Sequence, residues 1–365
     1  MLKKIIFTLI GIFLSSLFTL IIIDLILFFF PVNQGMRAQS VNKQNPVFRF
    51  EPNRNSQYSK NWNFDIKNTV KTNNDGFVND FNYNEKSKKK LLSIIGDSYV
   101  EALMVPFKDS LNGRLQKMAS EKRVYSFAAS GAGLAQHMIW AKYSKDKYKS
   151  DYFVFVIISN DFAESLAKYE KSPGFHRFKK TEDNKWNLEL ANYEPSTIRK
   201  IFRKSRLAMY LITNIKIHNL LNYQLQFGVN DERKIYVSNF QANYNEEFWK
   251  DAKWVTEIYL NNLYKYSGVK PEKILFVIDG IRQNIYDTED KVYLESFWYN
   301  IRQHFIKEAK LKGYHILDMH EEFKKSYINK KKKFEFKTDS HWNSFGHKTV
   351  TDSIVKTDLW KNFIK

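Results

Sequence analysis

Five short runs of apolar, β-prone residues constrain the fold of this chain more than any other feature. They are Leu91–Gly96, Arg123–Ala128, Tyr152–Ser159, Lys273–Asp279 and Tyr314–Asp318. Near-continuous apolar strands are typical of a parallel sheet that is covered on both faces. Helical segments lie between them, as crossover connections require, for example Ser110–Ser120, Ala135–Lys145 and Leu294–Leu311. The sequence therefore predicts an α/β fold with three layers, α/β/α.

The spacing of these runs is uneven, because a long segment separates the third from the fourth. Part of this segment, about 168–250, is rich in aromatic residues, Asn and Lys and lacks a regular alternation of strands and helices. We expect an insertion between strands 3 and 4 that packs over or beside the sheet. Its Trp186, Trp249 and Trp254 either join the core or stack on sugar rings, and both alternatives stay open.

The N-terminus carries a long apolar run. Lys3 and Lys4 precede Ile5–Phe30, whose 26 residues would form a helix of about 39 Å, longer than the ~30 Å hydrocarbon core of a bilayer. The run is longer than that of a signal peptide and lacks an Ala-x-Ala site, so we expect residues 1–31 to be an uncleaved transmembrane signal anchor. The Lys pair predicts a cytoplasmic N-terminus. The chain would then cross a bacterial-type cytoplasmic membrane once, with a stalk at 32–70 and an extracytoplasmic catalytic domain at 71–365.

Composition excludes several chemistries. The chain has no cysteine, so disulfides, thiolate catalysis and Cys-ligated metals are ruled out. The formal net charge is +19, but much of the Lys lies in clusters such as 86–90 and 330–333, which are typical of solvated surfaces. No nucleic-acid motif accompanies the charge, so we expect no nucleic-acid partner. The histidines show no metal-ligand spacing, and we expect neither a metal nor a cofactor.

Two short motifs carry the chemistry. Ile94-Ile95-Gly96-Asp97-Ser98-Tyr99 places Ser98 after a buried strand, at the edge where open α/β sheets bind ligands. Near the C-terminus, Thr338-Asp339-Ser340-His341-Trp342-Asn343 places His341 before an amphipathic helix that Asn343 or Ser344 can cap. Ser98 as nucleophile, His341 as base and Asp339 as orienting acid are the groups that activated-serine catalysis needs.

Together these motifs resemble those of the SGNH/GDSL hydrolase superfamily. Gly96-Asp97-Ser98 is similar to its first sequence block, Ser130-Gly131-Ala132-Gly133 to the second, Ser159-Asn160-Asp161 to the third and Asp339-x-His341 to the last. Residues 72–80 resemble a lead-in found in polysaccharide-modifying members. The resemblance covers roughly residues 70–160 and 270–355.

The resemblance implies both the fold and the roles of the residues. The fold would be a five-stranded parallel flavodoxin-like sheet between helices. The oxyanion hole would consist of the backbone N–H groups of Ser98 and Gly131 and the side chain of Asn160. Two alternatives stay open: Thr338 in place of Asp339, and Gly133 in place of Gly131.

The implied activity is that of a serine-dependent esterase or O-acyltransferase, with acetyl as the expected acyl group and a cell-envelope or extracellular polysaccharide as the substrate. Its partners would be the acylated glycan, the membrane through the N-terminal helix and, for a transferase, an acyl-donor membrane protein. The alternatives are a catalytically silent glycan-binding or assembly subunit, and a membrane-associated lipase or lysophospholipase.

Overall fold

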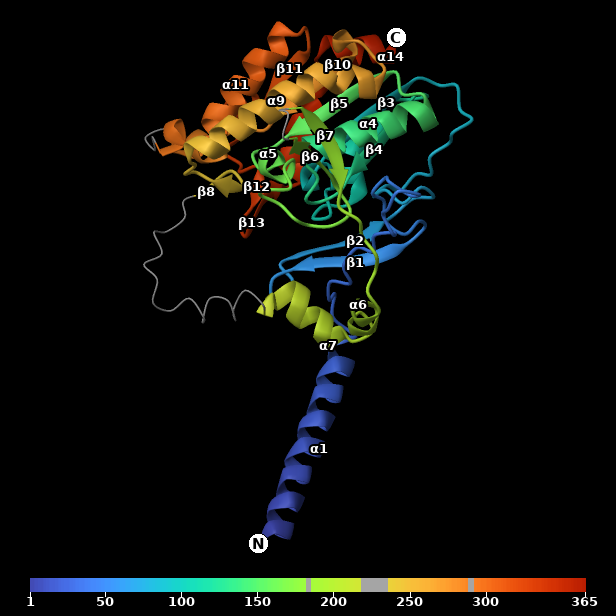
Figure 1. Ribbon diagram of the computed structural model, residues 1–365, viewed down its shortest axis with the longest axis vertical. Helices are drawn as coiled ribbons and strands as arrows, with labels where there is room; N and C mark the ends of the chain where they lie inside the picture. The colour runs from blue at the N-terminus through green and yellow to red at the C-terminus, as the bar shows by residue number, and fades with distance from the viewer. Residues whose placement is uncertain (182–184, 218–235, 288–291) are drawn as a thin grey trace. The chain divides into compact units, whose positions relative to one another are not determined.

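A computed structural model describes residues 1–181, 185–217, 236–287 and 292–365 (Figure 1). Its described residues divide into two compact units. The first comprises residues 1–37, 55–70 and the described part of 195–230, and the second comprises 38–54, 71–194 and the described part of 231–365. The insertion expected at about 168–250 is thus shared between the units, and its residues 182–184 and 218–235 lie outside the described part.

The first unit contains the apolar helix α1 (Leu2–Leu27), which is long and apolar enough to cross a membrane. A two-stranded sheet, β1 (Asn55–Lys60) and β2 (Ile66–Lys71), lies within the segment expected as a stalk. The helices α6 (Thr197–Phe202) and α7 (Arg206–Met209) complete the unit together with a π-helical turn, Tyr210–Ile215. Asp24 of α1 accepts hydrogen bonds from Ser205 Oγ at 2.7 Å and from the Leu207 amide at 2.8 Å, at the start of α7.

The second unit is built on a five-stranded parallel sheet, as the sequence predicts. Its strands are β3 (Leu91–Gly96), β4 (Arg123–Ala128), β5 (Tyr152–Ile157), β10 (Ile274–Ile278) and β11 (His315–Asp318). Their order is β11-β10-β5-β3-β4, and every pair is parallel. The order reverses between β3 and β5, because the chain continues from β3 to β4 on one side and from β5 to β10 on the other. Such a switch point is where open α/β sheets bind ligands.

Helices cover both faces of this sheet, which explains why its strands are apolar throughout. On β5, Val154 and Val156 join a core with α3 (Leu111–Met118), α12 (Met319–Lys330), α13 (Ser344–Ile354) and α14 (Asp358–Ile364). Phe153 and Phe155 alternate with these valines and point to the other face. There Phe155 packs edge-on against Tyr259 of α9 (Glu246–Ser267), which lies between α4 (Leu134–Tyr148) and α11 (Phe297–Leu311).

Shorter elements complete the second unit. They are α2 (Ser98–Glu101), α5 (Asp161–Glu164) and α10 (Arg282–Tyr286), and the antiparallel strand pairs β6–β7 (His176–Lys180, Trp186–Leu190), β8–β9 (Tyr236–Val237, Phe240–Gln241) and β12–β13 (Glu335–Phe336, Asp339–Trp342). Most of them follow the carboxyl end of a sheet strand or belong to the insertion, so they surround the edge that carries the motifs.

The lead-in at residues 72–80 is a buried structural element. The Asn73 side chain accepts from the backbone N–H groups of Asp75 and Phe77, both at 3.0 Å. The buried Asp75 carboxylate binds Arg49 at 3.0 Å and Lys147 of α4 at 2.7 Å. These contacts fasten the lead-in to α4 beside the sheet.

Candidate active site

Ser98 is presented at the carboxyl end of β3 by a tight turn. A Cβ atom on Gly96 would lie 2.5 Å from a methyl group of Val100, so the turn requires glycine. Asp97 caps the next helix, because its Oδ1 accepts from the Tyr99 amide at 2.9 Å.

His341 lies on the short strand β13, directly before α13. Asn343 is the N-cap of α13 and accepts from the amides of Phe345 and Gly346, both at 2.9 Å. Of the two capping residues that the sequence allows, the chain therefore uses Asn343. The cap fixes where the helix begins and so fixes the strand that carries His341.

The structure brings Ser98, His341 and Asp339 together. His341 Nε2 lies 2.7 Å from Ser98 Oγ, and His341 Nδ1 lies 2.5 Å from Asp339 Oδ1. The same carboxylate oxygen also accepts from the His341 amide at 2.8 Å, which fixes the direction of the acid. Ser98 has one hydroxyl proton, and its contact with Asp97 Oδ2 is longer, at 3.1 Å. The ring is thus held between a serine hydroxyl and a buried carboxylate, as nucleophile activation requires.

The residues expected in the oxyanion hole surround this pair. Asn160 Nδ2 lies 3.4 Å from Asp97 Oδ2, the oxygen that Ser98 Oγ also contacts, so the amide and the hydroxyl are neighbours. Gly131 lies in the loop after β4 with a φ of +87°, which favours glycine. Gly133, the alternative to Gly131, is closely packed, since a Cβ atom there would lie 2.5 Å from the Ser165 amide nitrogen.

The strand order and the meeting of the four sequence blocks at one sheet edge decide the fold. The chain has an SGNH/GDSL hydrolase-like fold. No protein-family model matches the chain, and no curated protein matches it.

Three solved structures show the same general likeness. A member of the lipolytic G-D-S-L family from Veillonella parvula is 9% identical, with 74% of this chain and 98% of that chain covered and a TM-score of 0.39. An acetyl xylan esterase is 11% identical, with 72% and 97% covered and a TM-score of 0.35. A lipase from a goat rumen metagenome is 12% identical, with 73% and 96% covered and a TM-score of 0.39. All three TM-scores lie below 0.5, so the description of the fold rests on the strand order of this chain's own sheet.

Glu101 connects the turn that carries Ser98 to the loop that holds Gly131. Its buried carboxyl accepts from the Ser130 amide at 2.9 Å and from Ser130 Oγ at 2.5 Å. Burial raises the pKa of Glu101 to about 7. No sequence motif indicates this residue, because the contact joins two separate loops.

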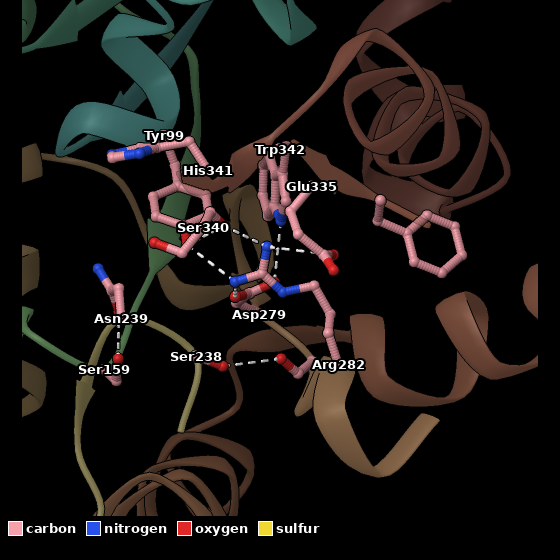
Figure 2. A network of polar contacts seen from close by, with 12 residues as sticks. Tyr99, Ser159, Ser238, Asn239, Asp279, Arg282, Glu335, Ser340, His341 and Trp342 are labelled. Carbon is pink, nitrogen blue, oxygen red and sulfur yellow. Dashed lines mark hydrogen bonds and ion pairs between the residues drawn. The ribbon is translucent and has the colours of Figure 1, made fainter. Parts of the chain in front are cut away.

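Asn239 is a second residue that the sequence motifs did not indicate. It lies in the turn between β8 and β9, where its side-chain amide donates to Asn160 Oδ1. The same side chain accepts from Ser159 Oγ (Figure 2). Because Asn160 Oδ1 accepts from Asn239, the Asn160 NH₂ group points toward Asp97 and Ser98. Asn239 lies in the insertion, which contains no family motif, so the sequence alone did not indicate it.

A buried network around Arg282 holds the strand that carries His341 (Figure 2). Arg282 of α10 donates to the Ser340 carbonyl at 2.5 Å and to the Tyr99 hydroxyl at 2.9 Å. Tyr99 in turn donates to the same Ser340 carbonyl at 2.9 Å. The charge of Arg282 is balanced by Asp279 at 3.3 Å, which also accepts from Trp342 Nε1 at 2.9 Å. The network therefore connects the residue after Ser98 to the residues on both sides of His341.

Among the described residues, Asp97, Asp161 and Glu164 form a group with metal-binding donor atoms, all within 4.8 Å of one another. Spacing along the sequence did not indicate this group, because Asp97 comes from a different loop. Burial raises the pKa of all three carboxyls, that of Glu164 to about 8. Raised pKa values oppose the deprotonation that a cation site requires.

Arg282→Lys should slow the reaction of Ser98 with a fluorophosphonate probe by about ten- to a hundredfold, because an ammonium group cannot reproduce the guanidinium contacts to Ser340 and Tyr99. Arg282→Met should instead destabilise the fold by about 3–5 kcal/mol, since it leaves Asp279 buried without its cation. The labelling rate measures the first effect and Tm measures the second.

The control is Arg123→Lys, which changes another buried arginine that bonds backbone carbonyls of Asn84, Lys89 and Tyr148. A normal labelling rate in folded Arg282→Lys would contradict the positioning role.

Glu101→Gln should make the protein relatively more stable as the pH rises. The pKa of Glu101 is raised from 4.5 to about 7 by burial, so between these values the folded state binds a proton that the unfolded state has lost. The stability of the wild type therefore falls as the pH rises through 7, while Gln keeps the acceptor for Ser130 and cannot ionise. The difference in Tm between variant and wild type should grow from pH 5 to pH 8. If the curves of Tm against pH for variant and wild type were parallel, this prediction would be wrong. The control is Glu121→Gln, at an exposed site.

Proposed function

We propose that this chain is a serine-dependent ester hydrolase or O-acyltransferase that acts on a cell-envelope or extracellular polysaccharide, with acetyl as the acyl group. The observation that carries the proposal is the 2.7 Å contact between Ser98 Oγ and His341 Nε2, with Nδ1 of the same ring on the buried Asp339. A hydroxyl in contact with an oriented imidazole is the arrangement that generates a serine nucleophile.

In the first half of the proposed reaction, Ser98 Oγ attacks the ester carbonyl while His341 Nε2 takes the hydroxyl proton. Asp339 keeps the Nδ1 proton of the ring and stabilises the imidazolium that forms. The negative charge that develops on the carbonyl oxygen is stabilised by the backbone N–H groups of Ser98 and Gly131 and by the Asn160 amide. Collapse of the intermediate expels the sugar oxygen, which takes the proton from His341, and leaves an acyl group on Ser98.

In the second half, His341 removes a proton from the attacking nucleophile, and the acyl–Ser98 bond breaks. The reaction is a hydrolysis when water attacks and a transfer when a sugar hydroxyl attacks. Both outcomes use the same groups in reverse order, so one site serves either activity.

The proposed glycan substrate is supported by two features of the chain. Residues 72–80 resemble the lead-in of polysaccharide-modifying SGNH/GDSL members, and α1 is suited to hold the enzyme in a membrane. We propose that α1 anchors the chain by a single pass, with the residues that follow α1 outside the cytoplasm. In this position the enzyme meets polysaccharide at the surface where it is assembled.

The full-length protein in detergent should hydrolyse p-nitrophenyl acetate. Ser98→Ala and His341→Ala should each lower kcat by up to roughly 10⁶-fold, and the double variant should be no worse, because the members of such a site act as a unit. Asp339→Asn should fall between these variants and the wild type. His304→Ala, which changes a histidine of α11, is the control.

The same assay tests the proposal against its alternatives. Retention of most activity in Ser98→Ala would refute the nucleophile, and a fully inactive wild type would favour a silent glycan-binding subunit. Release of acetate from acetyl-xylan or from acetylated acidic glycans is expected. A preference for lysophospholipid over all glycans would contradict the proposed substrate.

The membrane topology predicts that a reporter active only outside the cytoplasm is active when fused after Lys365. The protein should also remain in the membrane fraction after a carbonate wash, because α1 is long and apolar enough to span the bilayer. A reporter fused before Met1 is the control and should be inactive. Release of a shortened soluble form would show that the N-terminal segment is a cleaved signal peptide.

A further inference from the structure

A cavity of about 340 Å³ in the second unit has no role in the reaction described above. Five aromatic residues line it: Tyr169, Tyr236, Phe240, Tyr244 and Phe248. Its volume lies at the lower end of the range for ligand pockets, which suits a single ring rather than a long chain.

The walls of the cavity are continuous with the segments that hold Asn160. Tyr236 and Phe240 come from the β8–β9 hairpin, whose turn residue Asn239 donates to the Asn160 side chain. Another wall is Ala163 of α5, the helix that begins directly after Asn160. The cavity is therefore built onto the oxyanion side of the proposed site.

Much of the aromatic wall is fixed by contacts among its own residues and with residues outside the cavity. The Tyr169 hydroxyl donates to Asp251 at 2.6 Å, and its ring packs edge-on against Phe248 with centroids 4.8 Å apart. Phe248 in turn stacks on Phe240 at 5.5 Å, and the Tyr244 hydroxyl accepts from Asn300 at 3.1 Å. Tyr236 differs, since 56% of it is exposed, so it forms part of the rim. A wall held in this way loses little conformational entropy when a ligand binds.

The chemistry of the lining selects the class of ligand. Among the residues that the structure describes, the lining is aromatic and neutral-polar. It combines aromatic ring faces with the side-chain amide of Gln241. A sugar ring, which presents C–H groups to aromatic faces and hydroxyls to an amide, matches this lining.

We propose that this cavity binds a neutral sugar residue of the acylated glycan. The inference rests on the proposed function and names the part of the substrate that the insertion recognises. A sugar held here places the ester that it or its neighbour carries toward Asn160 and Ser98.

The test compares two tyrosines of equal exposure. Tyr236 lines the cavity and Tyr264 of α9 does not, and each is 56% exposed, so neither substitution should unfold the protein. Calorimetry on full-length Ser98→Ala in detergent measures binding of unacylated xylohexaose and of a hexamer of N-acetylglucosamine. Adding Tyr236→Ala should weaken binding of the preferred oligosaccharide by about five- to tenfold, because a stacking face is lost. Tyr236→Phe and Tyr264→Ala should bind like the parent.

The remaining outcomes overturn the inference in distinct ways. Equal affinities for Tyr236→Ala and Tyr264→Ala, or no oligosaccharide binding, would remove the sugar site. Tyr236→Ala can also be made in the active protein, in which Ser98 is intact. If it changed the ratio of activities on p-nitrophenyl octanoate and p-nitrophenyl acetate, but not oligosaccharide binding, the cavity would be assigned to an acyl chain. Because the binding experiment needs no turnover, oligosaccharide binding by a protein without esterase activity would refute the proposed function and leave the sugar site standing.

Discussion

The candidate site depends on one buried charge, the guanidinium of Arg282. The strand that carries His341 pairs with the two residues of β12 and is not a strand of the five-stranded sheet. Arg282 supplies that support by binding the Ser340 carbonyl while its charge is balanced by Asp279, at the end of β10. A buried ion pair contributes little net stability, because desolvation offsets the attraction. Its contribution here is geometric, since it places His341 against the nucleophile turn.

The polar groups at the sheet edge form a second constraint, because almost all of them are removed from water. Asp97 contacts both Ser98 and Asn160, and Glu101 holds the loop that contains Gly131. Each carboxyl is stabilised by backbone or side-chain donors, yet burial raises the pKa of both. This part of the molecule is therefore organised for position rather than for stability, as is common at functional sites.

The segment between β5 and β10 distinguishes this chain from a minimal SGNH/GDSL-like sheet. Part of it belongs to the same unit as α1, where Ser205 and the Leu207 amide bind Asp24. Another part forms the β8–β9 hairpin, which reaches the site through Asn239 and carries walls of the aromatic cavity. One insertion thus supplies both hydrogen-bond partners for the apolar helix and aromatic walls of the cavity.

The sequence by itself determined the five strands, the covered sheet, the apolar helix and the positions of Ser98 and His341. These follow from short-range effects: the alternation of side chains along a strand, the glycine of a tight turn and the cap of a helix. Only the tertiary structure decided that Asp339 contacts the His341 ring, that Gly133 serves packing and that Arg282, Glu101 and Asn239 support the site. Such contacts join residues far apart in the chain, and they depend on strand order and on which loops meet at the sheet edge, which local patterns do not encode.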